Sequence, residues 1–336
     1  MMFSGIGLVT RLAAPLMTAA AVVGAAALGP AQVVTAPALR LVNDDNPLAG
    51  RPFYVDPISA AMRAASAQPD NAQLAHVANT PQAYWLDQAF GPGSVSATVA
   101  RHTGAAAAAG ATPVLVLYAI PHRDCGSYAA GGFSSGASYR AWVDGVAEGI
   151  GGNPAAIVLE PDALAMADCL SGDARQERFD LINYAVDTLG RNPATAVYVD
   201  AGHSRWVSAE EMANRLNQAG VGRARGFSLN STNYFTTDEE TGYGEAISGM
   251  TGGKHYVIDT SRNGAGPAEG DPYGWCNPAG RALGTPPTTD TAGGHADAYL
   301  WVKRVGESDG SCGSGEPAAG HFVSQYAIDL ARNAGR

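Results

Sequence analysis

Short apolar runs alternate along this chain with segments in which apolar residues recur at helical spacing. The runs are rich in β-branched residues and predict seven strands, at residues 52–56, 113–120, 156–160, 195–200, 226–230, 255–259 and 298–303. The segments between them predict helices at 59–67, 95–110, 138–150, 174–190, 209–219, 238–250 and 320–333. This alternation indicates βαβ units and a parallel sheet. Because no reversal of strand order is apparent, the pattern favours a single α/β barrel domain over an open sheet.

Polar side chains follow the predicted strands at their carboxyl ends. They are Asp56, Asp124, Glu160 with Asp162, Asp200, Asn230 with Asn233, Asp259 and Lys303. In an α/β barrel, that face is where active sites are built. Several carboxylates that converge there, with aromatic side chains nearby, form the arrangement that acid/base cleavage of a sugar chain requires.

Asp162 is the strongest single candidate among these residues. It follows Pro161 and a predicted buried strand, so its carboxyl would stand at the rim of the barrel near other carboxylates. A partly desolvated acid in such a place stays protonated and can donate to a leaving oxygen. The alternative is an N-cap, because Ala-Leu-Ala-Met-Ala follows and would make a good first helical turn.

Other acidic positions have two interpretations each. Asp124 follows Arg123 and would tune the acid or help to position water, or else would be a salt-bridged loop residue. Asp309 stands in Gly-Glu-Ser-Asp-Gly, which also suits a solvated turn. Asp200 and His203 form a pair at a strand end, which would serve the site or would be buried hydrogen-bond partners.

Four aromatic side chains are expected at strand ends or in loops: Tyr118, Trp85, Trp206 and Trp275. Flat aromatic faces suit the apolar C–H faces of sugar rings, although each ring alone is also explained by loop packing. Trp142, inside an amphipathic helix, and Trp301, inside a strand, are assigned to the core.

The net charge of the chain excludes one class of partner. The 336 residues carry a formal net charge of -10, which argues against nucleic acid as a partner because phosphate binding needs a basic surface. A neutral polymer is compatible with this charge.

The first 31 residues have the pattern of a signal peptide. Arg11 supplies a positive n-region, residues 12–28 are almost wholly apolar, and residues 29–31 are a small-residue cleavage site, with 36–38 as an alternative. A retained membrane anchor is the competing interpretation. We expect a short segment at 32–45, a catalytic domain at 46–336, and a mature protein that is secreted and needs no membrane after signal cleavage.

The four cysteines suggest two disulfides in an exported chain. Three pairings exist, and we favour Cys125–Cys169 with Cys276–Cys312, because each pair would tie together two loops that follow strands. Buried free thiols are the alternative. The chain has no CxxC or HExxH spacing, so no zinc site is expected.

One pattern points to a different enzyme class. Gly132-Phe-Ser134-Ser-Gly136 matches the G-x-S-x-G pattern of serine hydrolases. That pattern requires a strand that runs directly into it. Here the predicted strand ends at Ile120, so a serine esterase is disfavoured.

Seven motifs in order closely resemble glycoside hydrolase family 6, the inverting cellulases, and most of all its secreted actinobacterial endoglucanases. They are Tyr118 with Arg123-Asp124-Cys125, Glu160-Pro-Asp162, Asp200-Ala-Gly-His203, Asn230 with Asn233-Tyr234, Asp259-Thr-Ser-Arg262-Asn263-Gly264, Trp275-Cys276-Asn277, and Trp301-Val-Lys303 with Glu307-Ser-Asp309-Gly310. The resemblance extends from about Asn46 to the C-terminus.

This resemblance implies a distorted barrel of about seven parallel strands with an open cleft. It implies that Asp162 is the general acid, that Asp124 supports it, that Asp309 is the debated catalytic base and that Tyr118 presses a sugar into a distorted ring. The sugar platforms would be Trp85, Trp206 and Trp275, and the hydrogen-bonding residues His203, Asn233, Lys303 and Glu307. It further implies the favoured cysteine pairing, a β-1,4-glucan as the partner, a monomer, and no metal or cofactor.

Two departures from the family pattern affect these expectations. Relatives carry a serine thought to hold catalytic water where this chain has Ala130, and position 122 is His where other residues are common. Ser127 or Ser134 would have to substitute, or turnover would be low. A non-catalytic or weakly active glucan- or wall-binding protein is therefore the second hypothesis. No long insertion surrounds Cys312, so we expect an open cleft and internal cleavage.

Overall fold

The computed structural model describes residues 46–336 except 272, 313 and 314. The expected signal peptide at 1–31 and the segment at 32–45 therefore lie outside the described residues. None of the helices in the described part is long and apolar enough to cross a membrane.

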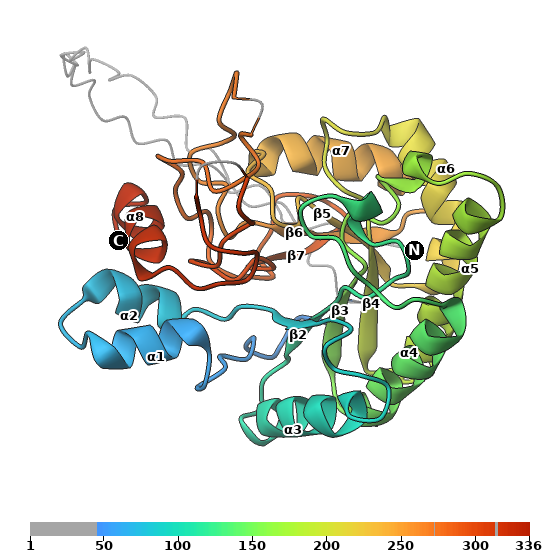
Figure 1. Cartoon of the computed structure of the whole chain (residues 1–336), viewed down its shortest axis with the longest axis horizontal. Coiled ribbons are helices and arrows are strands. Elements are labelled where there is room, and N and C mark those ends of the chain that lie inside the picture. The colour runs from blue at the N-terminus through green and yellow to red at the C-terminus, as the bar shows by residue number, and fades with distance from the viewer. Residues whose placement is uncertain (1–45, 272, 313–314) are drawn as a thin grey trace, which may run out of the picture. The chain divides into compact units, whose positions relative to one another are not determined.

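In the part of the chain that the structure describes, seven parallel strands follow one another in sequence order around a curled sheet (Figure 1). They are β1 (Tyr84–Leu86), β2 (Val114–Leu117), β3 (Ala155–Leu159), β4 (Thr195–Asp200), β5 (Gly226–Leu229), β6 (His255–Asp259) and β7 (Ala296–Leu300). In the described chain β1 and β7 share no ladder, but the N–H of Ala83 donates to the carbonyl of Trp301 at 3.0 Å, and the indole N–H of Trp85 donates to Val302 at 2.8 Å. The expected distorted α/β barrel is confirmed.

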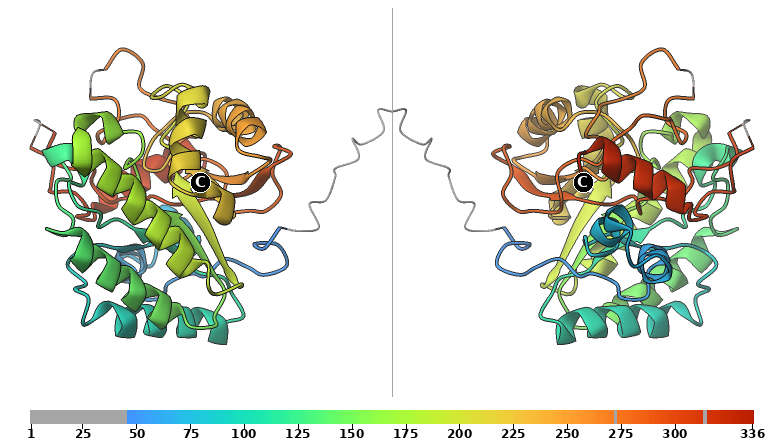
Figure 2. Two further views of the ribbon diagram at one scale, coloured as in Figure 1. Left: turned by 90° about the vertical axis from the view of Figure 1, so that its right-hand side faces the viewer. Right: turned by 90° about the vertical axis from the view of Figure 1, so that its left-hand side faces the viewer.

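Eight α-helices within the described residues accompany this sheet. They are α1 (Ala60–Ala67), α2 (Ala72–Ala78), α3 (Val95–Ala108), α4 (Gly136–Ile150), α5 (Gly172–Leu189), α6 (Ala209–Gln218), α7 (Thr237–Met250) and α8 (Ser324–Asn333). Helices α3 to α7 follow each other along the outer face of the sheet, whereas α1, α2 and α8 form a separate group (Figures 1 and 2). That group has its own apolar cluster, which includes Trp301.

The strands are apolar on both faces because both faces are covered. Leu115 and Ile157 belong to the cluster packed under the outer helices, whereas their neighbours Val116 and Val158 belong to the cluster inside the barrel. This alternation is the period-two geometry of a strand. Because all seven strands are parallel, their carboxyl ends lie at one rim of the barrel.

The first predicted strand is wrong. In segment 52–56 only Phe53 makes a bridge, to Thr112, and the sheet begins instead at β1. Pro52 and Pro57 lack the amide donors that a ladder needs. Trp85, expected at a strand end or in a loop, lies within strand β1, and helix α2 was not predicted. Trp142 and Trp301 are both buried as expected, although Trp301 follows β7 instead of lying within it.

Candidate active site

All eleven site residues expected from the sequence line one cleft of about 970 Å³ at the carboxyl ends of the strands. They are Trp85, Tyr118, Asp124, Asp162, His203, Trp206, Asn233, Trp275, Lys303, Glu307 and Asp309. The fold thus brings together side chains that lie as far as 224 positions apart in the sequence.

Asp162 lies three residues beyond Leu159, the last residue of the buried strand β3. Its backbone is left-handed, with φ of 70°, and its N–H donates to Oδ1 of Asp200 at 2.9 Å. Its carboxyl accepts no hydrogen bond from any described residue. Burial, and then the negative charges of Asp200 and Asp124, raise the pKa of Asp162 well above its ordinary value. Both causes favour the protonated form of this side chain. It caps no α-helix, because turns and the short 3-10 helix Ala167–Cys169 follow.

Asp200 is a buried anchor beneath the acid. Besides Asp162 it accepts the N–H of Gly202 at 2.9 Å and the hydroxyls of Ser228 and Ser231 at 3.0 and 2.6 Å. Burial raises its pKa to about 6, although these hydrogen bonds favour the charged form. His203 is not its partner but stacks on Phe235, with ring centres 4.2 Å apart.

Asp124 faces the cleft from the loop that follows β2. Its carboxylate accepts the N–H of Ala129 at 2.6 Å, and burial raises its pKa. The neighbouring Arg123 donates instead to the carbonyl of Tyr118 at 2.7 Å and lies 4.4 Å from the centre of that ring. The adjacent disulfide Cys125–Cys169 ties this loop to the loop after β3, which confirms the first predicted pairing.

Asp309 is held between two cations. Nη1 of Arg262 lies 2.7 Å and Nζ of Lys303 lies 2.9 Å from its carboxylate, which also accepts from the Tyr234 hydroxyl and the Asn277 N–H. Burial opposes ionisation, but the charges of Arg262 and Lys303 hold the pKa of Asp309 well below its usual range. A carboxylate held in this way is a weak proton acceptor.

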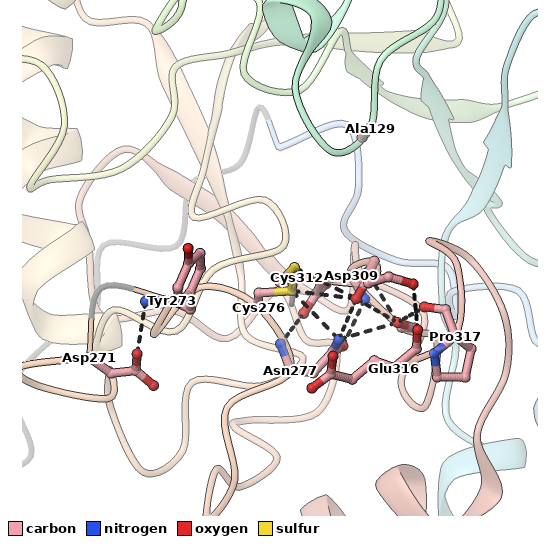
Figure 3. Close-up of a disulfide and its surroundings, with 12 residues drawn as sticks. Ala129, Asp271, Tyr273, Cys276, Asn277, Asp309, Cys312, Glu316 and Pro317 are labelled. Atoms are coloured by element: carbon pink, nitrogen blue, oxygen red, sulfur yellow. Dashed lines mark hydrogen bonds between the residues drawn. A yellow bond between two sulfur atoms is a disulfide. The ribbon is translucent and has the colours of Figure 1, made fainter. Parts of the chain in front are cut away.

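The second predicted disulfide, Cys276–Cys312, lies beside Asp309 and is also confirmed (Figure 3). Asn277, next to Cys276, both donates its N–H to the Asp309 carboxylate and accepts the Asp309 N–H at 2.8 Å. The disulfide therefore joins the two chain segments that meet at this carboxylate.

The aromatic side chains form the apolar part of the cleft wall. Trp85 meets Tyr118 edge to face, with ring centres 5.4 Å apart. Trp206 and Trp275 are 41% and 38% exposed, so their ring faces are accessible for stacking by a flat ligand. Tyr128, which the sequence did not single out, lies 5.2 Å from Trp275.

The polar side chains on the cleft wall differ in their charge and in their hydrogen-bond or ion-pair partners. Burial lowers the pKa of His203 to about 4, so that its ring is neutral at neutral pH. Glu307 pairs with Nε of Arg304 at 2.9 Å. Asn233 donates to the Ser231 carbonyl. Arg123 and Arg205 also line the cleft, and only their closeness in sequence to Asp124 and His203 could have pointed to them.

Two serine hypotheses have different outcomes. Ser127 lines the cleft together with Ala130, whereas Ser134 does not and is exposed elsewhere. Strand β2 ends at Leu117, far before Ser134, so the geometry of a nucleophilic serine elbow is absent from this described segment. Nor do the described residues include any group of three His, Cys, Asp or Glu that could hold a metal ion.

Comparison with known proteins places this geometry in context. The model of the family "Glycosyl hydrolases family 6" matches residues 44–334. The endoglucanase Cel6 of Mycobacterium tuberculosis, solved in complex with methyl-cellobiosyl-4-deoxy-4-thio-β-D-cellobioside, has 75% sequence identity and a TM-score of 0.86, over 87% of this chain and 100% of that one.

Two curated relatives are also similar. Endoglucanase A of Cellulomonas fimi is 50% identical over 284 residues, which cover 84% of this chain and 61% of that protein. Endoglucanase 1 of Streptomyces halstedii is 42% identical over 292 residues, which cover 83% of this chain and 88% of that protein. This chain therefore spans about three fifths of the Cellulomonas relative.

Proposed function

Because this chain belongs to glycosyl hydrolases family 6, we propose that it is a secreted endo-β-1,4-glucanase that cleaves internal bonds of cellulose-type glucans with inversion of configuration. The observation that carries this proposal is the Asp162 carboxyl, which has a raised pKa and faces a cleft flanked by aromatic rings. The three similar proteins reported above are each named as endoglucanases, which supports the same activity.

Asp162 acts as the general acid and protonates the departing glycosidic oxygen. Asp124, whose charge contributes to the raised pKa of Asp162, keeps that proton in place. Tyr118 packs against Trp85 and Arg123, so its ring forms a fixed wall against which a sugar can be distorted towards the transition state.

Proton removal from the attacking water is the harder step to assign. Inversion requires the acid and the base to stand roughly 6.5–9.5 Å apart, with the water between them. Asp309 is the candidate base, but its two cations make it a weak one. We propose that it acts through a chain of water molecules, and that its negative charge orients this chain.

The substrate is a single β-1,4-glucan chain. Trp85, Trp206 and Trp275 supply platforms for its rings, and His203, Asn233, Lys303 and Glu307 supply hydrogen bonds to its hydroxyls. We propose that the protein acts as a monomer. A binding protein of low activity is the second candidate, and Ala130 in the cleft wall is the observation in its favour.

Viscometry of carboxymethyl cellulose tests the activity. We expect a rapid fall in viscosity with few new reducing ends, and its loss in Asp162→Asn. Glucan affinity without release of reducing ends would favour the binding protein, and cellobiose as the sole early product would contradict internal cleavage. Nuclear magnetic resonance of the first product should show the α-anomer.

A further inference from the structure

One acidic and one basic side chain lie buried beneath the cleft and do not line it. Glu160 is 1% exposed and Arg178, from α5, is 2% exposed. Their charges interact, and neither belongs to the residues that we expect to touch a glucan. Both nevertheless bond to the backbone segments that carry the reacting groups.

Glu160 holds the start of the segment after β2. Both of its carboxylate oxygens accept the N–H of Ala119, at 3.1 and 3.0 Å, and one also accepts the N–H of Ile120 at 3.1 Å. Ala119 directly follows Tyr118. The carboxylate therefore fixes the peptide groups from which the Tyr118 ring projects.

Arg178 holds the continuation of the same segment and joins it to the acid. Its Nη2 donates to the carbonyls of Pro121 at 3.4 Å and His122 at 2.7 Å, and its Nη1 donates to the carbonyl of Ala163 at 3.1 Å. Ala163 directly follows Asp162. One guanidinium thus bridges the turn of the acid and the loop that leads to Asp124.

These two segments need external support because their backbones are unusual. Five residues with side chains have positive φ there: His122 at 58°, Asp124 at 54°, Cys125 at 50°, Glu160 at 52° and Asp162 at 70°. Such conformations persist only where the surrounding structure over-determines them. Backbone bonds from a buried carboxylate and a buried guanidinium supply that constraint.

We propose that Glu160 and Arg178 are positioning residues that hold Tyr118 and Asp124 in register with the acid Asp162. This inference rests on the proposed function. A small displacement of one reacting group is enough to cost about 100-fold in rate, so the effect should appear in kcat. Binding should be affected little, because Trp206 and Trp275 are carried by other loops.

The test compares Arg178→Met with Arg225→Met on carboxymethyl cellulose, and records kcat, KM and Tm for each. Arg225 makes a bidentate pair with the buried Asp297 at the opposite end of the barrel, at 2.7 and 2.8 Å, so its loss should lower Tm without reaching the cleft. For Arg178→Met we expect kcat to fall about 10- to 100-fold, with KM within about threefold of the wild type. Arg178→Lys keeps the positive charge and one donor nitrogen, so its kcat should lie between those of Arg178→Met and the wild type.

A lower Tm with an unchanged kcat in Arg178→Met would overturn the proposal, as would a rise in KM in place of the fall in kcat. If Arg178→Met does not fold, Arg178→Lys and the isosteric Glu160→Gln carry the test, with the same kcat-specific loss expected. Failure of all three to fold would overturn the proposal, since it would assign both residues to folding. An inactive wild type would count against the proposed function itself, whereas an active wild type with unaffected variants would count only against this inference.

Discussion

The main-chain N–H of Asp162 donates to the carboxylate of Asp200 at 2.9 Å, so the acid is held by a group that also repels its negative charge. Asp200→Asn keeps an oxygen acceptor for this N–H but removes the repulsion. An acid must be protonated to act, so activity is lost as the pH rises through its pKa. Without the charge of Asp200 that pKa should fall, and the alkaline limb of the kcat/KM profile should move to lower pH.

Asp144→Asn is the control for this shift. Asp144 bonds to Tyr184 on the outer surface, away from the cleft, and the same charge is removed there. Its alkaline limb should coincide with that of the wild type. An Asp200→Asn profile that keeps its limb and loses only height would mean that Asp200 positions the acid without tuning it.

The ion pairs of Asp309 predict a large effect on stability. Asp309→Asn would leave Arg262, which is fully buried, without its charge partner at 2.7 Å. Loss of one partner of a buried pair costs about 3–5 kcal/mol. Chemical denaturation should therefore show a much lower free energy of unfolding, whereas Asp187→Asn, in the exposed pair with Arg223, should change it by at most about 1 kcal/mol.

The same variant gives a signature in acid. The folded-state pKa of Asp309 is depressed, so its contribution to stability is present above the unfolded value of about 3.9 and is lost as the pH falls below it. The difference between Asp309→Asn and the wild type should therefore shrink as the solution is acidified. A difference that stays constant with pH would mean that the lost stability comes from packing.

The sequence predicted the barrel and most of the cleft residues because they follow from periodicity and strand ends, whereas Glu307 was expected only from the family resemblance. It could not separate two kinds of strand-end carboxylate. The carboxyl of Asp162 faces the cleft. The other carboxylates point away from it and accept backbone N–H groups of neighbouring loops; they are Glu160, Asp200 and Asp259. The direction of each side chain depends on left-handed backbone at Glu160 and Asp162. This conformation is uncommon for residues other than glycine, so the sequence does not indicate it.

The hydrophobic pattern also failed to predict the short elements near the first strand of the sheet. Among the described strands, β1 pairs with β2 alone, and it has only three residues, Tyr-Trp-Leu. A run of three residues is too short to show the alternation by which a strand is recognised. Segment 52–56 looked more like a strand but begins with Pro52 and is followed directly by Pro57. Likewise, nothing in the sequence pointed to Arg178, since a lone arginine in an amphipathic helix is ordinarily exposed.

Ala130 predicts a gain of activity. It lines the cleft on the loop that begins at Asp124, and its methyl group offers water no hydrogen bond. Ala130→Ser should add one, and a net hydrogen bond of about 1 kcal/mol corresponds to a rise in kcat of roughly fivefold. Steady-state kinetics on soluble glucan measure it, with Ala109→Ser, at an exposed position outside the cleft, as the control. An unchanged kcat would mean that Ser127 or the backbone already holds the water.

Trp275 predicts a loss of binding without a loss of chemistry. Its ring is 38% exposed, stands 5.2 Å from Tyr128 and lies in the cleft away from the acid's own loop. Trp275→Ala should therefore raise KM for soluble glucan about 5- to 30-fold, the equivalent of about 1–2 kcal/mol of stacking, with kcat nearly unchanged. Ile58→Ala, which removes an exposed apolar side chain outside the cleft, should alter neither constant. A fall in kcat at constant KM would instead show that the stacking at Trp275 is used only in the transition state, and that this ring helps to distort the sugar.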